Sequence, residues 1–497
     1  MKITFISHAA ILVEAGDLRV LSDPWWQGPC FGNQWWLYPK PYLECLDGRP
    51  IDYVYISHGH PDHFHRGTLR RFPRGTKVII SRGSVLARAL QDMDLEVIQL
   101  APEEVRNLGN SVACQIMPTY GGDSLMIIMD RNEVCVNAND SLHSAPHSLQ
   151  NQVTARIKAL YPRIDYLFCA YGIASHFPNC YIIPGKDYVR TAENRQRYFN
   201  RQWARVASLL EPRFAFPFAA DMILLEPDLF WTNEPVHNSE RPTSAFTSLY
   251  PSSATKVVDI GPGFALANGT IIQDVRFRPL RAGEVRSAYS AVISKYKTQP
   301  ERRTDGADLL KETLEHNIVV CRSFLCEFSE DYRFLLLLRD RTWALQIVKQ
   351  RSEIHVNLVD ADTIAHAEYD VILTSTFAYL RRSLTRDYGN EILFVGSGCL
   401  IEYTDQQRIK KNLHEELTIL IAKHRGPPKS RFGDQPKWLF QMKSIVKALL
   451  GRHEVDLYDL QAWTLFKDKA PAPMPAGHRQ RKLFRRAGRT PPRRRNP

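Results

Sequence analysis

The sequence predicts a mixed α/β protein, and three observations support this fold class. From residue 1 to about 245, apolar strand-like runs alternate with helical stretches across short loops. Several of these runs follow one another in close order, as antiparallel neighbours do. A second alternation of helix and strands occupies residues 305–425. We therefore expect four regions: a larger α/β domain over 1–280, a smaller α/β domain over 281–425, a helical extension over 426–470 and a disordered Arg-rich tail over 471–497.

The individual elements follow from composition and turn signals. The runs KITFISHAAILVEA and LRVLSDPW predict two neighbouring strands joined by a turn at Gly16 and Asp17. Later strands of the first domain are predicted at 51–58, 77–81, 95–101, 112–120, 124–130, 133–140 and 165–172, with helices beginning at Thr68 and over 84–93 and 148–160. Residues 245–280 are strand-rich and irregular. In the second domain we expect strands at 334–340, 342–350, 353–360 and 399–404, and helices at 306–317, 369–384, 406–424 and 435–450.

Composition restricts the class of protein. The 497 residues are 44% hydrophobic and 24% charged, as in soluble globular proteins, and no apolar run approaches the roughly 20 residues of a membrane helix. The N-terminal residues carry Glu14 and Asp17 where a signal peptide would be apolar, so we expect a cytoplasmic location. Nine cysteines without a CxxC pair indicate reduced thiols rather than a zinc ribbon or an iron–sulfur cluster.

The net charge of +12 is concentrated at the C-terminus. Residues 478–497 contain nine Lys or Arg and no acidic residue. This composition cannot bury a core, so the tail is expected to be disordered. It is either simply solvated or contacts nucleic acid, an anionic membrane surface or an acidic partner.

The stretch YVYISHGHPDHFH, from Tyr53 to His65, predicts a metal site. His58 and His60 are two residues apart at the end of a strand, so their side chains can project the same way. A turn after His60 would bring Asp62 and His63 to face the same point. Imidazole and carboxylate ligands without thiolate suit Zn²⁺, Fe²⁺ or Mn²⁺, bound as one ion or as two. Such a centre polarises a substrate oxygen and activates water near neutral pH.

The HxHxDH pattern resembles the signature of the metallo-β-lactamase superfamily, whose fold is an αββα sandwich. The opening hairpin, with Ser7-His8 and Asp23-Pro24, resembles the branch that includes ascorbate-6-phosphate lactonase and the N-acyl-phosphatidylethanolamine phospholipase D. The runs DPWWQGPCFGNQWWLYPKP and FAFPFAADMILLEPDLFWTNEPVHNSERP are similar to the metal-binding part of CMP-N-acetylneuraminate hydroxylase. These resemblances cover roughly residues 1–280. The second domain resembles a sterol-carrier-like domain.

The resemblance implies roles for particular residues. It implies that Asp23 braces the histidine loop from beneath. We expect catalytic roles for Asp62 and for His8, which lies near a strand end and would reach the same rim as a substrate-facing acid or hydrogen-bond donor, the alternative being a core histidine. The resemblance implies zinc, as one ion or two, with iron as the alternative. The implied metal ligands are His58, His60, Asp62, His63 and Asp140.

The sequence departs from the family pattern at two histidine positions. Family hydrolases carry a metal-binding histidine after the strand that here ends MPTYGGDS, where Tyr120 and Asp123 are the only candidates. They also carry a late histidine where this chain reads FPFAAD. His176, at a strand end, is a candidate for a replacement metal ligand or for a contact to the substrate. His143 and His147, in a loop near Asp140, are interpreted as bystanders.

Three functions fit these residues. The first is a metal-dependent hydrolase that attacks an ester, lactone, amide or phosphodiester with metal-activated water. The second is an oxidoreductase resembling the hydroxylase, which would act on an N-acyl sugar or nucleotide sugar with iron. The Rieske module of that family needs CxH and CxxH pairs, which this sequence lacks, so electrons would come from a separate protein. The third is a degenerate site that only binds. The expected substrate is a small molecule: a sugar, a nucleotide sugar or a phospho-compound.

Overall fold

The computed structural model describes most of the chain before residue 425. The predicted helical extension (426–470), the tail (471–497), the predicted helix at 435–450, Tyr120 and His176 lie outside the described residues. Among the described residues, no helix combines the length and the apolar character that crossing a membrane requires. The described ranges are 1–119, 122–172, 180–182, 185, 187–298, 306–325, 331–340, 343–386, 389–404 and 417–424.

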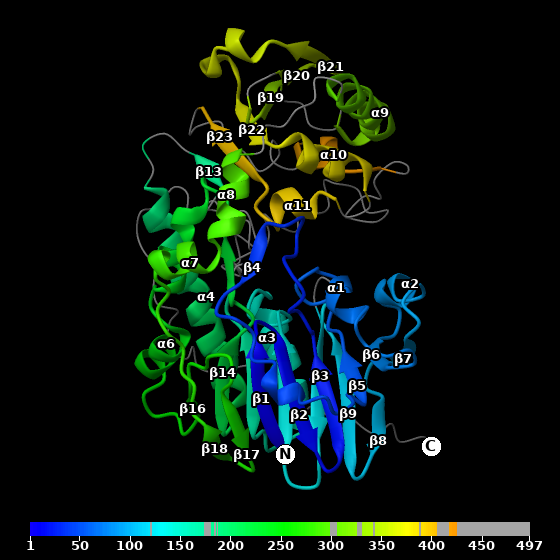
Figure 1. Cartoon of the computed structure of the whole chain (residues 1–497), viewed down its shortest axis with the longest axis vertical. Coiled ribbons are helices and arrows are strands. Elements are labelled where there is room, and N and C mark those ends of the chain that lie inside the picture. The colour runs from blue at the N-terminus through cyan, green and yellow to red at the C-terminus, as the bar shows by residue number, and fades with distance from the viewer. Residues whose placement is uncertain are drawn as a thin grey trace, which may run out of the picture.

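Two sheets face each other in the first part of the chain (Figure 1). In spatial order, the eight-stranded sheet consists of β18 (Thr270–Gln273), β17 (Ala265–Ala267), β1 (Lys2–Ser7), β2 (Ala10–Ala15), β3 (Leu18–Ser22), β5 (Tyr53–Tyr55), β6 (Lys77–Ser81) and β7 (Glu96–Leu100). The seven-stranded sheet consists of β16 (Lys256–Val257), β14 (Phe214–Phe218), β12 (Tyr166–Ala170), β11 (Val134–Asn139), β10 (Ser124–Met129), β9 (Val112–Pro118) and β8 (Val105–Gly109).

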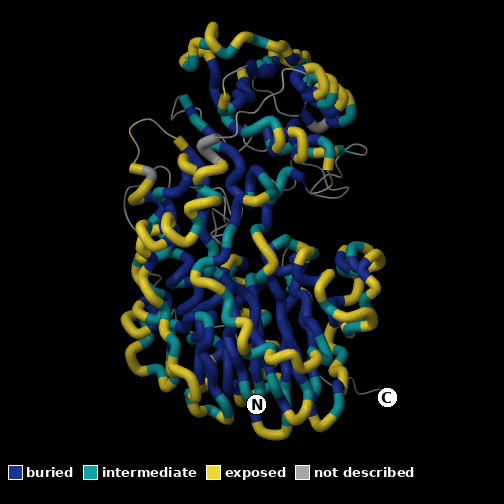
Figure 2. The backbone as a smooth tube through the Cα atoms, in the orientation of Figure 1, coloured by how far each residue is buried: buried dark blue, intermediate teal, exposed yellow. Residues whose placement is uncertain are grey.

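The hydrophobic core explains why these strands form layers. Alternate residues of β1, such as Ile3 and Phe5, point between the sheets and meet Phe168 and Phe216 of the opposite sheet. Figure 2 shows the strands of this sandwich as mostly buried, with exposed residues concentrated in the connecting loops. The outer face of the first sheet packs on two short helices, α1 (Arg66–Leu69) and α2 (Leu86–Ala89).

The outer face of the second sheet is covered by three longer helices. These are α3 (His147–Leu160), α4 (Tyr188–Leu210) and α6 (Pro242–Leu249). Helices therefore lie on both outer sides of two stacked sheets, and the predicted αββα sandwich is confirmed. The remaining helices of this part are α5 (Asn233–His237), α7 (Ala282–Ala288) and α8 (Ser290–Thr298), and a small two-stranded sheet pairs β4 (Trp35–Leu37) with β15 (Met222–Leu224).

The second α/β unit is built on a six-stranded sheet. Its spatial order is β13 (Tyr181–Ile182), β23 (Cys399–Tyr403), β22 (Val371–Ser375), β19 (Tyr332–Leu338), β20 (Ala344–Gln350) and β21 (Glu353–Val359). Helices α9 (Ala307–Leu325) and α10 (Phe377–Thr385) pack on this sheet, and the short α11 (Glu391–Phe394) follows α10. The edge strand β13 comes from the first part of the chain and pairs in parallel with β23, which ties the two units together.

Three sequence predictions about elements need correction. The predicted helix over 369–384 is a strand, β22, followed by α10, whose Thr376 side chain caps the helix by accepting from the Tyr379 N–H. The predicted single strand over 2–15 is a hairpin of β1 and β2 that turns at His8 and Ala9. The 23-residue helix α4 was not predicted at all.

Side-chain contacts fix the second unit over one end of the sandwich. Trp35 Nε1 donates to the Gly396 carbonyl oxygen at 3.0 Å. Glu226, which is 2% exposed, accepts a hydrogen bond from Tyr379 Oη at 2.8 Å and pairs with Arg339 at 2.5 Å. Figure 1 shows α10 and α11 above the strand ends from which the histidine loop leaves. This junction therefore places the second unit beside the predicted site.

Candidate metal centre

The predicted site residues converge at one end of the sandwich because the strands that carry them end there. The histidine loop follows β5, which lies parallel to β3, so Asp23 at the end of β3 reaches the same edge. Asp140 follows β11 of the opposite sheet. His8 occupies the β1–β2 turn. The two sheets thus contribute donors from separate segments to one place.

Three non-glycine residues beside this point have left-handed backbone conformations. His8 has φ 45°, Asp23 has φ 37° and Asn139, the neighbour of Asp140, has φ 46°. Such conformations are uncommon outside glycine and gather at functional sites, where the surrounding structure holds them in place. Here they turn the chain sharply at each strand end, which aims the side chains inward.

The first donor group combines imidazoles from the histidine loop with a carboxylate from the opposite sheet. His58, His63 and Asp140 can each place a ligand atom within 4.8 Å of the others. His63 Nε2 lies 3.3 Å from Asp140 Oδ2. His60 Nδ1 lies 2.8 Å from His58 Nε2, so His60 belongs to the same cluster. This group contains four of the five residues that the sequence analysis gave as implied metal ligands.

The second donor group shares His63 with the first. It consists of His8, Asp62 and His63, again with ligand atoms within 4.8 Å of one another. Asp62 Oδ2 lies 3.0 Å from His8 Nε2 and 3.4 Å from His63 Nε2. We expected His8 to act as an acid or hydrogen-bond donor at the rim. The structure places it among the donors themselves, on the side where the family's late histidine is missing.

Asp23 orients the shared histidine. Its Oδ2 lies 2.9 Å from His63 Nδ1, and its Oδ1 accepts from the Ser57 N–H at 2.8 Å. Asp23 and His63 are both fully buried. Because Asp23 engages Nδ1, the free nitrogen of His63 is Nε2, which faces Asp62 and Asp140. A carboxylate behind a metal-binding histidine fixes the tautomer of the ring in this way. The predicted bracing role of Asp23 matches this geometry.

The electrostatics of the cluster favour a cation at its centre. Burial lowers the pKa of His63, but Asp140, Asp62 and Asp23 outweigh it and raise that pKa well above its ordinary value. Burial raises the pKa of Asp62, yet His63 and His8 bring it down to about 2. The pKa of Asp140 is likewise lowered by His63 against the effect of burial. Asp62 and Asp140 therefore favour positive charge beside His63 Nε2, and Asp23 adds negative charge at Nδ1.

The residues fit a divalent metal. Among the described residues, four buried atoms in the cluster have no hydrogen-bond partner: His63 Nε2, Asp62 Oδ1, Asp140 Oδ1 and His8 Nδ1. Buried polar atoms are rarely left in this state, and four of them on neighbouring side chains indicate a missing ligand. All are nitrogen or carboxylate oxygen, which suits zinc, iron or manganese equally. A metal ion bound there would supply the positive charge that the neighbouring carboxylates favour.

Other histidines of this region have structural roles. His65, the fourth histidine of the motif, caps α1 by accepting from the Thr68 N–H at 3.1 Å. His143 is buried, with Nε2 bonded to the Gly172 carbonyl oxygen at 2.9 Å, and His147 bonds to Gln202. The interpretation of His143 and His147 as bystanders agrees with these contacts.

Two carboxylates lie in the two segments where this chain lacks the histidines of the family pattern. Asp123 Oδ1 lies 4.0 Å from His58 Nδ1. Burial, together with Asp140, raises the pKa of Asp123 to about 7. Asp221, in the FPFAAD run, accepts from the His8 N–H at 3.3 Å and thereby fixes the turn that carries His8. The sequence analysis considered Asp123 and missed Asp221, although its position in that run was a signal for it.

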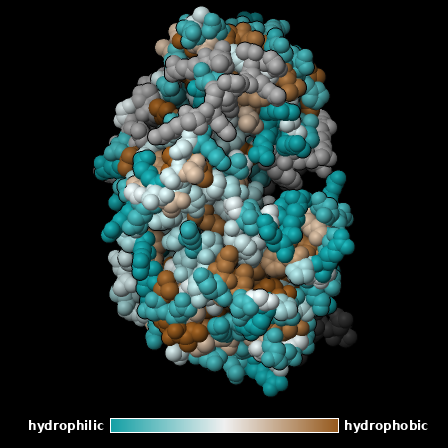
Figure 3. Space-filling model, in the orientation of Figure 1, coloured by the Kyte–Doolittle hydropathy of each residue, from teal (hydrophilic) through white to brown (hydrophobic). Residues whose placement is uncertain are grey.

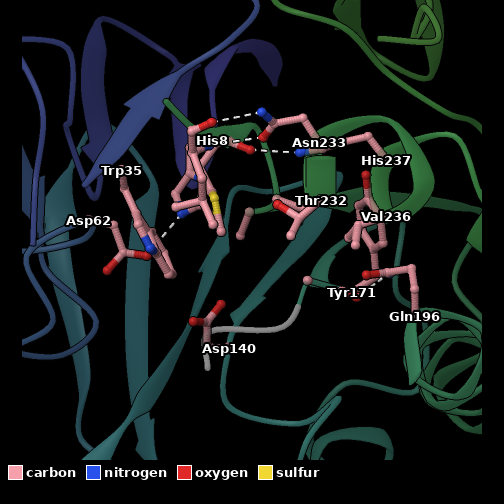
Figure 4. A pocket seen from close by; sticks show the side chains of 15 residues that line it. His8, Trp35, Asp62, Asp140, Tyr171, Gln196, Thr232, Asn233, Val236 and His237 are labelled. Atoms are coloured by element: carbon pink, nitrogen blue, oxygen red, sulfur yellow. Dashed lines mark hydrogen bonds and ion pairs between the residues drawn. The ribbon is translucent and has the colours of Figure 1, made fainter. Parts of the chain in front are cut away.

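A cavity opens from the second donor group toward the second sheet. Figure 4 shows His8, Asp62 and Asp140 at one end of it and Gln196, Thr232, Val236 and His237 at the other. Its walls mix apolar side chains with a few polar groups, as small-molecule sites do. The sequence analysis did not identify the far residues, because they come from α4, α5 and their neighbours. The lining residues are His8, Trp35, Asp62, Asp140, Tyr171, Gly172, Gln196, Ala219, Ala220, Met222, Leu224, Thr232, Asn233, Val236 and His237.

Comparison with known families agrees with this geometry. Residues 2–154 match the family model described as "Beta-lactamase superfamily domain". This match covers the histidine loop and Asp140, and it confirms the predicted resemblance to the metallo-β-lactamase superfamily. A solved metallo hydrolase from the archaeon Ignicoccus hospitalis is 17% identical, with a TM-score of 0.36 over 53% of this chain and 97% of that one.

Curated relatives include CMP-N-acetylneuraminic acid hydroxylases. The one from Danio rerio is 40% identical over 75 residues, which is 15% of this chain and 13% of the relative. The one from Gorilla gorilla gorilla is 25% identical over 292 residues, which is 55% of this chain and 46% of the relative. The chain thus matches less than half the length of either hydroxylase.

Proposed function

We propose that this chain is a metal-dependent hydrolase whose metal is held by the two donor groups that share His63. The observation that carries the proposal is the grouping of imidazole and carboxylate ligand atoms that share His63, on residues that also have buried atoms without a hydrogen-bond partner. Because Nε2 is the one free nitrogen of His63, it would bind a single ion, held also by His58, His60, Asp140 and Asp62, while His8 beside them stays free to transfer a proton. When bound, the metal polarises a substrate oxygen and lowers the pKa of water to near neutrality.

The chain's own residues would supply orientation and proton transfer. Because the pKa of Asp62 is lowered to about 2, its carboxylate stays ionised near neutral pH and can accept a hydrogen bond from the attacking water. His8 lies 3.0 Å from that carboxylate and faces the cavity, so it can carry a proton to the leaving group. Asp23 would keep His63 in one tautomer throughout. The substrate would be an ester, lactone, amide or phosphodiester.

Hydrolysis should depend on metal and not on a reductant. We expect the zinc-loaded protein to cleave at least one compound in a panel of activated esters, lactones, amides and phosphodiesters. Chelation should abolish this activity, and added zinc should restore it. As a matched control, His147→Gln alters a nearby histidine outside the cluster and should keep activity within about twofold, as expected for a residue outside the chemistry. Absence of cleavage across the panel by protein that holds stoichiometric metal would refute the proposal.

A second function is favoured by one observation, the similarity to hydroxylases over 292 residues. In that case the same donor atoms would hold iron, and a separate protein would supply electrons. The two functions are distinguished by the metal and by the electron requirement. Iron after aerobic purification, with turnover only in the presence of a reductant, would favour the oxidoreductase; zinc with turnover in its absence favours the hydrolase.

A further inference from the structure

A second opening, separate from the cavity described above, also reaches the histidine loop. It is a groove between the two units, floored by His58 and His60. One wall comes from α1 and its neighbouring loops, and the other from α10 and α11 of the second unit. Figure 3 shows the surface hollowed between the units on this side, with hydrophilic residues along the lower rim.

Two pairs of arginines face each other across this groove. Arg66 and Arg70 belong to α1 and its C-terminal cap, and Arg382 and Arg386 belong to α10 and its cap. Both pairs have a spacing of four residues, which places each pair on one side of its helix. Arg382 reaches across the junction, since a Cβ atom added to Gly32 of the first unit would lie 3.1 Å from Arg382 Nη1.

Most of these arginines form no ion pair within the described residues. Arg66 pairs with Asp92 at 2.7 Å. Within the described ranges, no carboxylate lies within ion-pair distance of Arg70, Arg382 or Arg386, and all three are exposed. Among the described residues, the acidic side chains that line the groove are Asp123 and Glu391. The three guanidinium groups without an ion pair therefore outnumber these two carboxylates.

We propose that this groove binds an oxyanionic group of the substrate, a phosphate or a carboxylate, between the arginines of the two units. Guanidinium groups bind either oxyanion through paired charge-assisted hydrogen bonds. The bound group would lie between the arginines and would hold the substrate against the histidine loop. The inference rests on the proposed function, and it gives the second unit a part in substrate binding. Residues 2–154, which match the family model, do not include that unit.

The test is binding of three small probes to the metal-loaded, full-length chain by titration calorimetry. Phenylphosphonate and benzoate carry the two oxyanions on the same ring, and benzamide is the neutral reference. We expect the wild type to bind at least one anion and to bind benzamide far more weakly. Which anion binds distinguishes a phosphate-bearing from a carboxylate-bearing substrate. Failure of the wild type to bind either anion would overturn the proposal.

Substitutions locate the binding. Arg382→Gln with Arg386→Gln should weaken anion binding by at least about 10-fold, as the loss of charge-assisted hydrogen bonds predicts. Arg70→Gln should act in the same direction. The matched controls are Arg381→Gln, on α10, and Arg71→Gln, just after α1; both arginines are exposed and do not line the groove. An equal loss in the controls, or no loss in the groove variants, would overturn the proposal.

Metal content keeps this test separate from the proposed function. None of the substituted arginines belongs to the donor groups, so each variant should retain the metal of the wild type. An anion that binds only to the metal would be unaffected by Arg382→Gln with Arg386→Gln, which contradicts the inference and leaves the hydrolase proposal intact. If the wild type hydrolyses no compound of the panel but still binds the anion through the arginines, the hydrolase proposal fails and this inference stands.

Discussion

His63→Ala is expected to abolish stoichiometric metal binding. His63 is the one residue common to both donor groups, and its Nε2 faces Asp62 and Asp140 while Nδ1 is held by Asp23. Removing the imidazole takes away the ligand nitrogen that both donor groups share and leaves buried carboxylates without compensation. Because loss of even a supporting contact lowers metal affinity about 10–100-fold, loss of the shared ligand should lower it by more than about 100-fold. The measurement is competition with a chromophoric chelator.

The matched control for this variant is His65→Asn. His65 lies two residues away in the same loop but caps α1, and asparagine also caps helices well. This variant should bind metal as the wild type does. Equal affinity in His63→Ala and the wild type would show that the metal is bound elsewhere in the chain.

Glu226→Ala is expected to produce a large loss of stability. Glu226 is buried at the junction of the two units, where it accepts from Tyr379 and pairs with Arg339. Truncating it leaves the Arg339 charge, which is 20% exposed, without its main partner. Breaking a buried pair by removing one member typically costs about 3–5 kcal/mol. We expect the free energy of unfolding to fall by about 3 kcal/mol, measured by chemical denaturation of the metal-loaded protein.

Two smaller changes in the same network serve as controls. Tyr379→Phe removes one hydrogen bond to Glu226 and should cost about 1 kcal/mol. Asp228→Asn affects a carboxylate that is 47% exposed and 3.8 Å from Arg339, so its effect should stay within about 0.5 kcal/mol. If Glu226→Ala were no more destabilising than Asp228→Asn, the junction would not depend on this pair.

The sequence predicted the centre of the site because that information is local. A β-branched run before His58 indicated a strand end, and the spacing of the histidines and Asp62 indicated which side chains converge there. Asp140 was recognisable in the same way, as a carboxylate directly after a buried strand. The structure adds the sharing of His63 between two donor groups, which depends on the packing of two sheets.

The structural features that the sequence did not predict are mostly unusual turns or contacts between residues far apart in the chain. The hairpin at His8 turns without Gly, Pro or Asn, so the run from Lys2 to Ala15 gave no turn signal. The β22 strand did carry a signal, the run VILTS followed by the capping Thr376, but it was read as part of a helix. Arg382 lies more than 300 residues from the histidine loop it approaches, and no local pattern reports such a contact.

The central claim is that this end of the sandwich holds a divalent metal, and elemental analysis of the purified wild type tests it most directly. Protein of known concentration should contain one or two zinc or iron ions per chain after extensive dialysis against metal-free buffer. Protein stripped by a chelator should regain the same number on titration with the metal. A chain that holds less than about a tenth of an equivalent and takes up none on titration would contradict the account, because the unpaired atoms around His63 would then have another explanation.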